Sequence, residues 1–329
     1  MIKKRCILKK IILFVNLTFF LLFVQTAAAQ QISLSFSPSL MEILIKPGKS
    51  IMLAYRLQNH ADPTIIRTKV RPFNPKNNRG DIEIKPEFDG PIRFSLDNAD
   101  LQLEQPFFLK TKDSQQLLLR LRVPEGTPEG DYYYTFLAET EPPPGTEGVT
   151  SSQTRAVIGS NLLITVTKTG TTEIKSKIVL FDLLTRFRFN LFGKTFRLAD
   201  SNDQIPLVLI VENQGKNLIK PVGQIVLKGN FGEKAIYEIL PSNILAQSQR
   251  LIEATPSAFL NQTKTSSLVL TGFFIGRYQL SASLNFGEGT PYTFARVDFW
   301  AFPFKLFLGG LVSFLAIVFV LKKIKNFEE

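Results

Sequence analysis

The sequence predicts an all-β protein of two tandem β-sandwich domains, with an N-terminal signal peptide and a C-terminal transmembrane helix. Three observations favour this class. Apolar and polar residues alternate with a period of two, Pro, Gly and Asn clusters separate the alternating runs, and no amphipathic helix of useful length lies between them. The chain has 329 residues, and the stretch between its two apolar ends suffices for two domains of ordinary size.

Residues 1–29 have the three parts of a secretory signal peptide. Residues 11–24 form an apolar core, and Ala27 to Ala29 form an A-x-A cleavage site before Gln30. Cys6, the only cysteine, is lost with this peptide, so no disulfide stabilises the mature chain, which is typical of a bacterial envelope protein. The positive residues that precede the apolar core are Lys3, Lys4, Arg5, Lys9 and Lys10.

The first sandwich is expected over residues 30–169. In the run 115–123, Leu119 and Leu121 lie on one face while Arg120 and Arg122 lie on the other, as in a half-buried strand. Pro-Gly and Asn-containing turns separate this run from its neighbours. The predicted strands lie near 32–36, 40–45, 50–58, 64–71, 81–84, 92–96, 101–104, 115–123, 131–140 and 154–168.

The second sandwich is expected over residues 170–299. Its sequence echoes the first: strands end in Leu57-Gln58-Asn59 and in Val211-Glu212-Asn213, which indicates two domains of similar plan, related by duplication. The short joint between the domains restricts their mutual orientation. The predicted strands lie near 173–180, 185–190, 195–198, 205–212, 222–229, 234–240, 249–254, 265–272, 276–286 and 290–299.

Residues 302–321 are predicted to span a membrane, with residues 322–329 as a basic cytoplasmic tail. The run 306–321 has Ser313 as its only polar side chain and would extend about 24 Å as a helix, close to the ~30 Å of a bilayer core. Lys305 is expected to reach the interface through its long stem. The alternative is a buried core helix. The predicted anchor residues are Trp300, Phe302 and Phe304 at the interface, Lys305, and Lys322, Lys323 and Lys325 in the cytoplasm.

The expected location is therefore the cell membrane, crossed once, with the two sandwiches outside and membrane lipid as a partner of the helix. The formal net charge of +11 falls to about +5 for the exported part once the signal peptide and the tail are set aside. This excess favours an anionic wall polymer or lipid headgroups as partners, although most such charge is a solvated surface.

No catalytic, metal or cofactor site is predicted. His60 is the only histidine, and no serine or cysteine can be placed beside it from sequence, so a turn residue is favoured over a triad member. The usual zinc ligands are lacking, and residues 200–203 have the oxygen atoms but not the spacing of a calcium loop. Phosphate-binding and dinucleotide glycine motifs are absent. The sequence predicts a non-enzymatic protein without cofactors or nucleic-acid partners.

A basic row is the first candidate binding surface. Arg67, Lys69 and Arg71 lie on one face of a predicted strand, and Arg79 follows in the next loop. These cations could bind an anionic polymer or carboxylates of a protein. The alternative is a soluble strand face that protects a sheet edge.

An aromatic and basic segment is the second candidate. Arg186 and Arg188 alternate with Phe187 and Phe189, and Phe192-Gly193 looks like a turn tip before Lys194. A partner or membrane contact is one interpretation, and a half-buried strand is the other. The polar loop 141–152 is a third candidate, for recognition or as a silent hairpin tip, and Asn261 begins a glycosylation sequon.

Several segments resemble the WxL-interacting proteins of Gram-positive bacteria and, more distantly, the first domain of pilus chaperones. They are the run from Ser37 to Glu42, the turn from Lys46 to Ser50, the Leu57-Gln58-Asn59 strand end, and Gly130-Asp131-Tyr132-Tyr133. Segments of the second half, such as Gly276-Arg277-Tyr278-Gln279, fit as well. The resemblance covers nearly the whole chain. It implies two immunoglobulin-like domains, the first linked to peptidoglycan and the second to a host or partner protein.

The leading hypothesis is a membrane-anchored surface protein that binds a wall polymer or an exported protein through its sandwich surfaces, for instance by strand addition at a free edge. A chaperone-like role in assembling exported proteins is the alternative. A third possibility is an accessory subunit of a membrane complex, for which Gly309-Gly310 offers a close-packing helix face.

Overall fold

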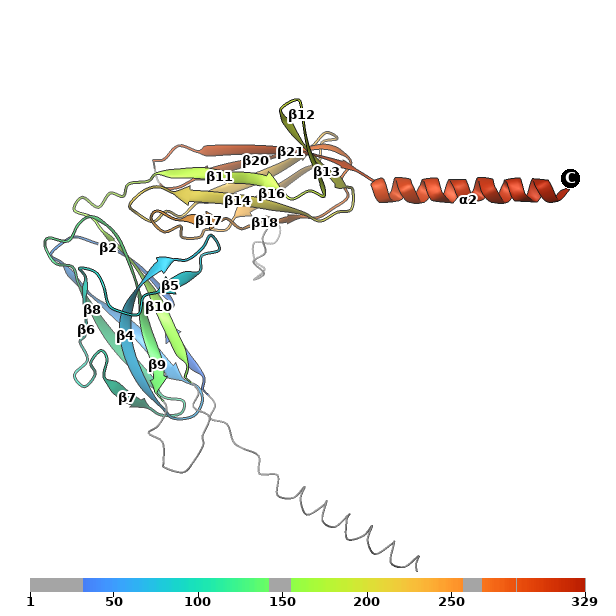
Figure 1. Ribbon diagram of the computed structural model, residues 1–329. Coiled ribbons are helices and arrows are strands. Elements are labelled where there is room, and N and C mark those ends of the chain that lie inside the picture. The colour runs from blue at the N-terminus through green and yellow to red at the C-terminus, as the bar shows by residue number, and fades with distance from the viewer. Residues whose placement is uncertain (1–31, 142–154, 257–267, 288, 329) are drawn as a thin grey trace, which may run out of the picture.

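The computed structural model describes residues 32–141, 155–256, 268–287 and 289–328. It consists of two β-sandwiches that meet at an angle and one helix that leaves the second sandwich (Figure 1). The predicted all-β, two-sandwich, immunoglobulin-like fold with a C-terminal apolar helix is confirmed. The predicted signal peptide, nearly all of the loop 141–152 and the sequon at Asn261 lie outside the described residues.

The first sandwich packs two sheets face to face. The chain changes sheet between β1 and β2, and β2 then pairs with β10 in parallel. One sheet has the order β1 (Leu34–Ser37), β3 (Ser50–Asn59), β8 (Ser114–Arg122), β6 (Arg93–Leu96). The other has the order β2 (Leu40–Ile45), β10 (Val157–Val166), β9 (Gly130–Glu141), β4 (Thr64–Pro75), β5 (Ile82–Ile84), with β7 (Pro106–Leu109) also on β4.

The second sandwich repeats this plan. Its larger sheet places β13, β21, β20, β15 and β16 in the order of β2, β10, β9, β4 and β5, and β13 is again parallel to β21. That sheet comprises β12 (Phe187–Leu191), β13 (Lys194–Asp200), β21 (Thr293–Phe302), β20 (Gly276–Asn285), β15 (Val222–Gly229), β16 (Lys234–Ile239) and β18 (Ala254–Pro256). The smaller sheet comprises β11 (Ser176–Leu183), β14 (Ile205–Asn213), β17 (Gln249–Leu251) and β19 (Val269–Leu270).

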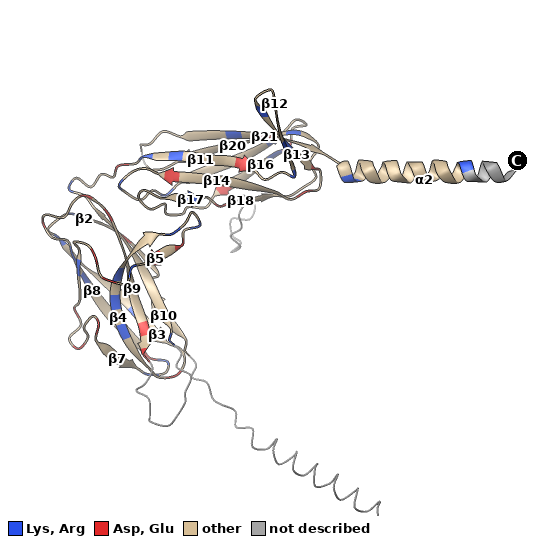
Figure 2. Cartoon of the chain, in the orientation of Figure 1, with Lys and Arg blue, Asp and Glu red and all other residues tan. Residues whose placement is uncertain are grey.

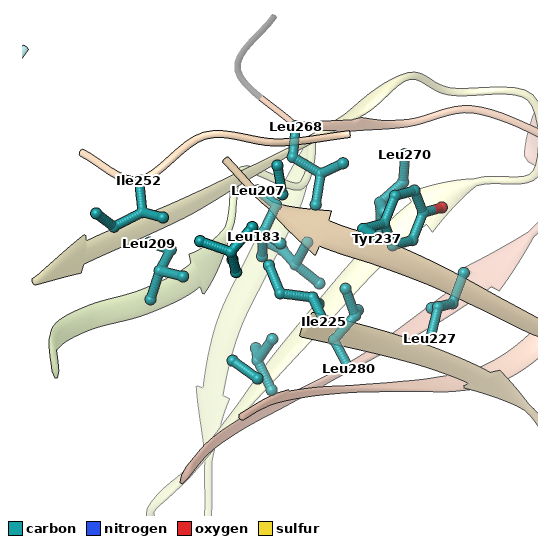
Figure 3. Close-up of a cluster of buried hydrophobic side chains, with 14 of the residues drawn as sticks. Leu183, Leu207, Leu209, Ile225, Leu227, Tyr237, Ile252, Leu268, Leu270 and Leu280 are labelled. Carbon is teal, nitrogen blue, oxygen red and sulfur yellow. The ribbon is translucent and has the colours of Figure 1, made fainter. Parts of the chain in front are cut away.

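Each sandwich has its own apolar core, as a chain without disulfides requires. Leu117, Leu119 and Leu121 of β8 are fully buried, as their alternation with polar residues predicts. The second core gathers Leu207 and Leu209 of β14 with Ile225 of β15 and Leu280 of β20, which point into the space between the sheets (Figure 3). Burial of such side chains contributes roughly 1.5–3 kcal/mol each.

Matching asparagines end equivalent strands of the two sandwiches. Asn59 of β3 and Asn213 of β14 are both 0% exposed. The amide of Asn59 donates to the carbonyl of Asp62 (2.7 Å) and accepts from the N–H of Ala61 (3.1 Å). Asn213 does the same with the carbonyl of Asn217 (2.8 Å) and the N–H of Gly215 (2.9 Å). The echo in the sequence therefore marks a shared turn-stabilising device.

Several strand boundaries differ from those expected, and the run expected at 249–254 is divided between β17 and β18, which lie in different sheets. Two further differences concern residues 101–104 and the end of β21. Residues 101–104 form no strand; Glu104 has a positive φ of 66°, and β7 begins only at Pro106. At the other end of the chain, β21 continues to Phe302 rather than ending at residue 299, because its last residues pair with β13, with Asp200 opposite Phe302.

The C-terminal helix α2 spans Phe304–Glu328, so it begins two residues later than the predicted membrane segment. Its part from Phe304 to Lys322 has a mean hydropathy of 2.4 and is unburied, and by length and composition it could cross a membrane. Figure 2 shows no charged residue on α2 between Lys305 and Lys322.

The two sandwiches are joined by a polar hub at Asp131, the second residue of β9. Its carboxylate accepts hydrogen bonds from the hydroxyls of Tyr133 (2.9 Å) and Thr165 (2.8 Å) in the first sandwich. It also accepts from the amide of Asn217 (2.9 Å) and the N–H of Leu218 in the second. Beside the hub, a small apolar cluster crosses the joint, formed by Phe73, Leu163 and Leu245. These contacts restrict the interdomain angle, as expected from the short linker.

Candidate binding surfaces

The basic row on β4 is neutralised by carboxylates of the first sandwich. Lys69 Nζ lies 2.6 Å from Glu139, and Arg71 Nη1 lies 2.9 Å from Glu104. Arg67 pairs in the same way with Glu141 on the neighbouring β9. The structure therefore places the three predicted cations together on one face, each with an acidic partner that would compete with an external anion.

Arg79 lies away from that row, in the loop between β4 and β5. This loop reaches the second sandwich: the N–H of Leu251 donates to the carbonyl of Asn78 at 2.6 Å, and a Cβ at Gly80 would clash with the guanidinium of Arg250. The loop thus belongs to the joint between the domains, and Arg79 stands exposed at its edge.

A cleft of about 390 Å³ lies at this joint. Phe73 and Leu245 contribute to its apolar lining, and Glu42 lies at its polar rim. Lys220 Nζ binds Glu42 at 2.9 Å and the amide of Asn243 binds the same carboxylate at 2.6 Å. Burial raises the pKa of Glu42, but the hydrogen bonds from Asn243 and Lys220 outweigh it, so the pKa lies below the usual value.

The hairpin of β12 and β13 is the most exposed structured element of the second sandwich. It has no counterpart in the first sandwich, where β1 leads almost directly into β2. All five residues of β12 are exposed, and β12 is the free edge of its sheet (Figure 1). Phe189 stacks on Phe196 across the hairpin at 5.5 Å; Phe189 is 48% exposed, and Phe196 is half-buried.

Phe192 is the tip of this hairpin and is 94% exposed. Phe192 and Gly193 both have positive φ, 50° and 73°, which is the backbone of a two-residue type I′ turn. Asn or Gly is the usual residue there, and a bulky aromatic at positive φ is uncommon. An exposed aromatic ring and a strained backbone both cost free energy in the folded protein. Their combination at Phe192 therefore indicates a functional role rather than a role in folding.

The cations of the hairpin fall into two groups. Arg188 and Arg197 both bind Asp182, and Arg188 Nη1 lies 2.9 Å from that carboxylate. Burial raises the pKa of Asp182, but its hydrogen bonds, that from Arg197 foremost, lower it overall. Arg186 instead lies over the ring of Phe187, 6.0 Å from its centroid, and Lys194 has no ion pair among the described residues.

Four of the predicted anchor residues lie where β21 meets α2, and the three lysines lie toward the other end of the helix. Phe302 packs on Phe304 at 5.1 Å, and Trp300 is exposed on the outer face of β21. Lys305 is held by protein rather than extending alone: its Nζ lies 2.6 Å from Asp203, and its N–H donates to Asp200 at 2.9 Å. Lys322 is exposed, and Lys323 and Lys325 lie on the last turns of α2, where side chains are outside the described part.

No metal-binding cluster of His, Cys, Asp and Glu occurs among the described residues. His60 does have a serine beside it, which the sequence did not reveal: Ser35 Oγ lies 2.8 Å from His60 Nε2. The pair is exposed and joins residues 25 positions apart. Pairing of β1 with β3 brings the two side chains together, so no local motif could have signalled the contact.

Sequence comparisons give no family. No protein-family model matches the chain, and no curated protein matches it. Neither comparison supports the resemblance to the WxL-interacting proteins, which stays a prediction.

Solved structures with a similar arrangement of strands include several fimbrial chaperones. The class 5 fimbriae chaperone CfaA is 12% identical, with a TM-score of 0.38 over 81% of this chain and 98% of that one. The E. coli chaperone DraB is 13% identical (TM-score 0.35; 82% and 98%). A chain from the complex of the Salmonella enterica SafA pilin with the SafB chaperone is 11% identical (TM-score 0.36; 82% and 99%). At this level the likeness carries no argument about what this chain binds.

Proposed function

We propose that this chain is a membrane-anchored, non-enzymatic protein that holds an exported protein partner by strand addition at the free edge of β12. Such holding is a chaperone-like or assembly function. The observation that carries the proposal is the exposure of β12, a sheet edge whose five residues are all exposed and include Phe187, Phe189 and Leu191.

Exposed apolar edge strands are a liability, because their unpaired backbone groups pair with any extended chain. Proteins normally shorten, charge or cover such an edge. Here the edge strand is aromatic, and its tip residue Phe192 is strained as well as exposed. A partner strand that pairs with β12 would cover both the backbone edge and the rings.

Membrane anchoring by α2 is part of the same proposal. The helix is apolar and exposed over 19 residues, from Phe304 to Lys322, which is about 28 Å at a helical rise of 1.5 Å. In water, an apolar surface of this size would cause the protein to aggregate. A bilayer would shield this surface from water. With both sandwiches outside the cell, β12 would lie close to the outer surface of the cell membrane.

The test removes one backbone donor from β12 without changing the hairpin. Leu191 and Lys194 close the two-residue turn, so alternation along the strand turns the N–H of Asn190 outward. Asn190→Pro removes that N–H, whereas the matched control Asn190→Ala keeps it. A photo-crosslinker at Phe189 in the full chain, in its native membrane, should capture an exported protein in the Ala variant and lose it in the Pro variant. Equal capture by both variants would contradict strand addition.

Binding of a wall polymer stays a prediction from sequence. The three cations on β4 that would carry it are each paired with a glutamate, so an external anion would have to compete with these ion pairs. Pull-down of the full chain with purified cell wall tests it separately. The accessory-subunit hypothesis likewise stays a prediction; Gly309 and Gly310 leave an open face on α2.

A further inference from the structure

The end of the second sandwich next to α2 exposes apolar side chains from two separate loops. Phe231, in the turn between β15 and β16, is 75% exposed. Phe273 and Ile275, in the loop before β20, are exposed as well, Phe273 by 53%. Neither loop belongs to a strand edge or to the hairpin of β12 and β13, so the proposed strand addition does not account for them.

Strand register places both loops at the level where β21 gives way to the helix. Gly276 pairs with Ala301, three residues before α2, and a Cβ on Gly276 would touch the ring of Phe231 at 3.4 Å. The loop that contains Phe273 is tied to the same place, because the N–H of Phe274 donates to the carbonyl of Ser201, whose own N–H donates to Phe302. We call Phe231, Phe273 and Ile275 the apolar end face.

Two lysines flank the apolar end face in an arrangement that a free protein would disfavour. Lys228 of β15 and Lys234 of β16 lie directly opposite each other across the strands, and neither forms an ion pair among the described residues. Like charges in this position are destabilising by themselves. An anion outside the protein would relieve the repulsion.

We propose that the apolar end face rests in the interfacial layer of the bilayer that holds α2, with Lys228 and Lys234 on anionic lipid headgroups. The inference rests on the membrane anchoring proposed above. Aromatic residues at the boundary between hydrocarbon and water, with lysines beside them, are the composition that this layer selects.

Lipid is the occupant that the geometry favours, because the helix begins at the same end. Only Pro303 separates the last residue of β21 from the first residue of α2. The start of the helix is also bound to the sandwich through Lys305, Asp200 and Asp203. If α2 enters the membrane at its first turn, the membrane surface therefore lies close to the apolar end face. The sandwich would then stand on the bilayer rather than swing above it.

Site-specific fluorescence in vesicles tests this contact with the full chain. With Cys6 replaced by serine, the chain has no other cysteine, so Phe231→Cys carries a single environment-sensitive fluorophore. Phe294→Cys is the matched control: Phe294 is 73% exposed in the same domain, but near the start of β21, at the end away from α2. Phe314→Cys, about 15 Å along α2, reports on the anchor itself.

A nitroxide carried near the lipid headgroup should quench the label at residue 231 and leave the label at residue 294 unquenched. A nitroxide deep in the acyl chains should quench the label at residue 314. Equal, weak quenching at 231 and 294, with strong quenching at 314, would overturn the lipid contact while leaving the anchor intact. Absence of quenching at 314 would overturn the anchor and the contact together.

The lysine pair has its own test in the same system. In vesicles that contain an anionic phospholipid, Lys228→Gln together with Lys234→Gln should reduce quenching of the label at 231 to its level in purely zwitterionic vesicles. Quenching that is the same with and without both lysines would overturn their role with headgroups.

Discussion

The two sandwiches have equivalent ends with opposite surfaces. In the first sandwich, the end at which β9 begins is covered by the second sandwich, through the Asp131 hub and the cluster of Phe73, Leu163 and Leu245. In the second sandwich, the end at which β20 begins exposes Phe231 and Phe273. Each such end adjoins the next part of the chain, and among the described residues the end of the first sandwich is covered by protein whereas Phe231 and Phe273 are not.

Phe73 and Phe231 make the contrast concrete. Phe73 lies near the end of β4, the strand beside β9. Phe231 lies just after the end of β15, the equivalent strand beside β20. Phe73 is buried against the neighbouring domain, whereas Phe231 is the most exposed aromatic of its end. Because the two sandwiches share one topology, we expect the exposed end of the second sandwich to be covered by a partner as well. The apolar helix α2 beside this end indicates that the partner is lipid.

We expect the largest loss of stability from substituting one residue at the covered end, and a much smaller loss from substituting the equivalent residue at the exposed end. Asp131 and Arg277 both follow the glycine that begins their strand. Asp131→Ala leaves four hydrogen-bond donors without their acceptor. One hydrogen bond to a charged group contributes about 1.5–3 kcal/mol, so we expect the free energy of unfolding to fall by at least about 3 kcal/mol.

Arg277→Ala is its matched control. Arg277 forms one exposed ion pair with Asp298, at 2.8 Å, which contributes less than about 1 kcal/mol. Urea titration of the two variants measures both values. A cost for Arg277→Ala as large as that for Asp131→Ala would remove the distinction between the ends.

The two buried asparagines should instead behave alike. Asn59→Ala and Asn213→Ala each leave buried backbone groups without a partner, at a cost of about 2 kcal/mol. Thermal unfolding should therefore show similar losses in the two variants. If one substitution were silent, the asparagines would not be the same device, and the duplication argument would weaken.

Phe192→Asn should stabilise the protein, by about 1 kcal/mol. Asparagine tolerates the positive φ of the hairpin tip, whereas phenylalanine carries a cost of roughly 1–2 kcal/mol there. The control is Phe294→Asn, a substitution of another highly exposed phenylalanine (73%) that has no positive φ, for which we expect no gain. A lower melting temperature for Phe192→Asn would show that the ring is needed for folding.

The smallest effect concerns pH at the joint. The pKa of Glu42 is lowered in the folded protein, so its carboxylate contributes stability above its unfolded pKa of 4.5, and this contribution is lost as the pH falls through the folded value. The exposed ion pair limits the effect to less than about 1 kcal/mol. Distance measurements between the sandwiches should show loosening only as the pH falls below 4.5. In Glu42→Gln that change should disappear.

Much of the fold could be predicted from sequence because alternation is local. The run 115–123 and the two asparagine-ended strands needed only neighbouring residues. Residues 101–104 misled because Leu101 and Leu103 alternate with polar residues, whereas Glu104 has a positive φ and donates its N–H to the carbonyl of Thr68, which is distant in the sequence.

The surfaces could be predicted only in part. The exposed tip at Phe192-Gly193 was visible as an aromatic in a turn, but the ion pairs of the β4 cations required the register of β4 with β9. The hydrogen bonds of Asp131 and the apolar end face could not be predicted, because both depend on which end of each sandwich lies next to the other domain or next to α2. One local signal was available for the face: an aromatic within Gly229-Asn230-Phe231-Gly232, a turn that otherwise favours small polar residues.

Neutron reflectometry of the full chain in a supported bilayer measures whether the free end of the second sandwich lies against lipid. We predict protein density that begins within the headgroup layer, with no separate water layer between bilayer and sandwich. A resolved water layer beneath the second sandwich, with α2 in the hydrocarbon, would contradict this account.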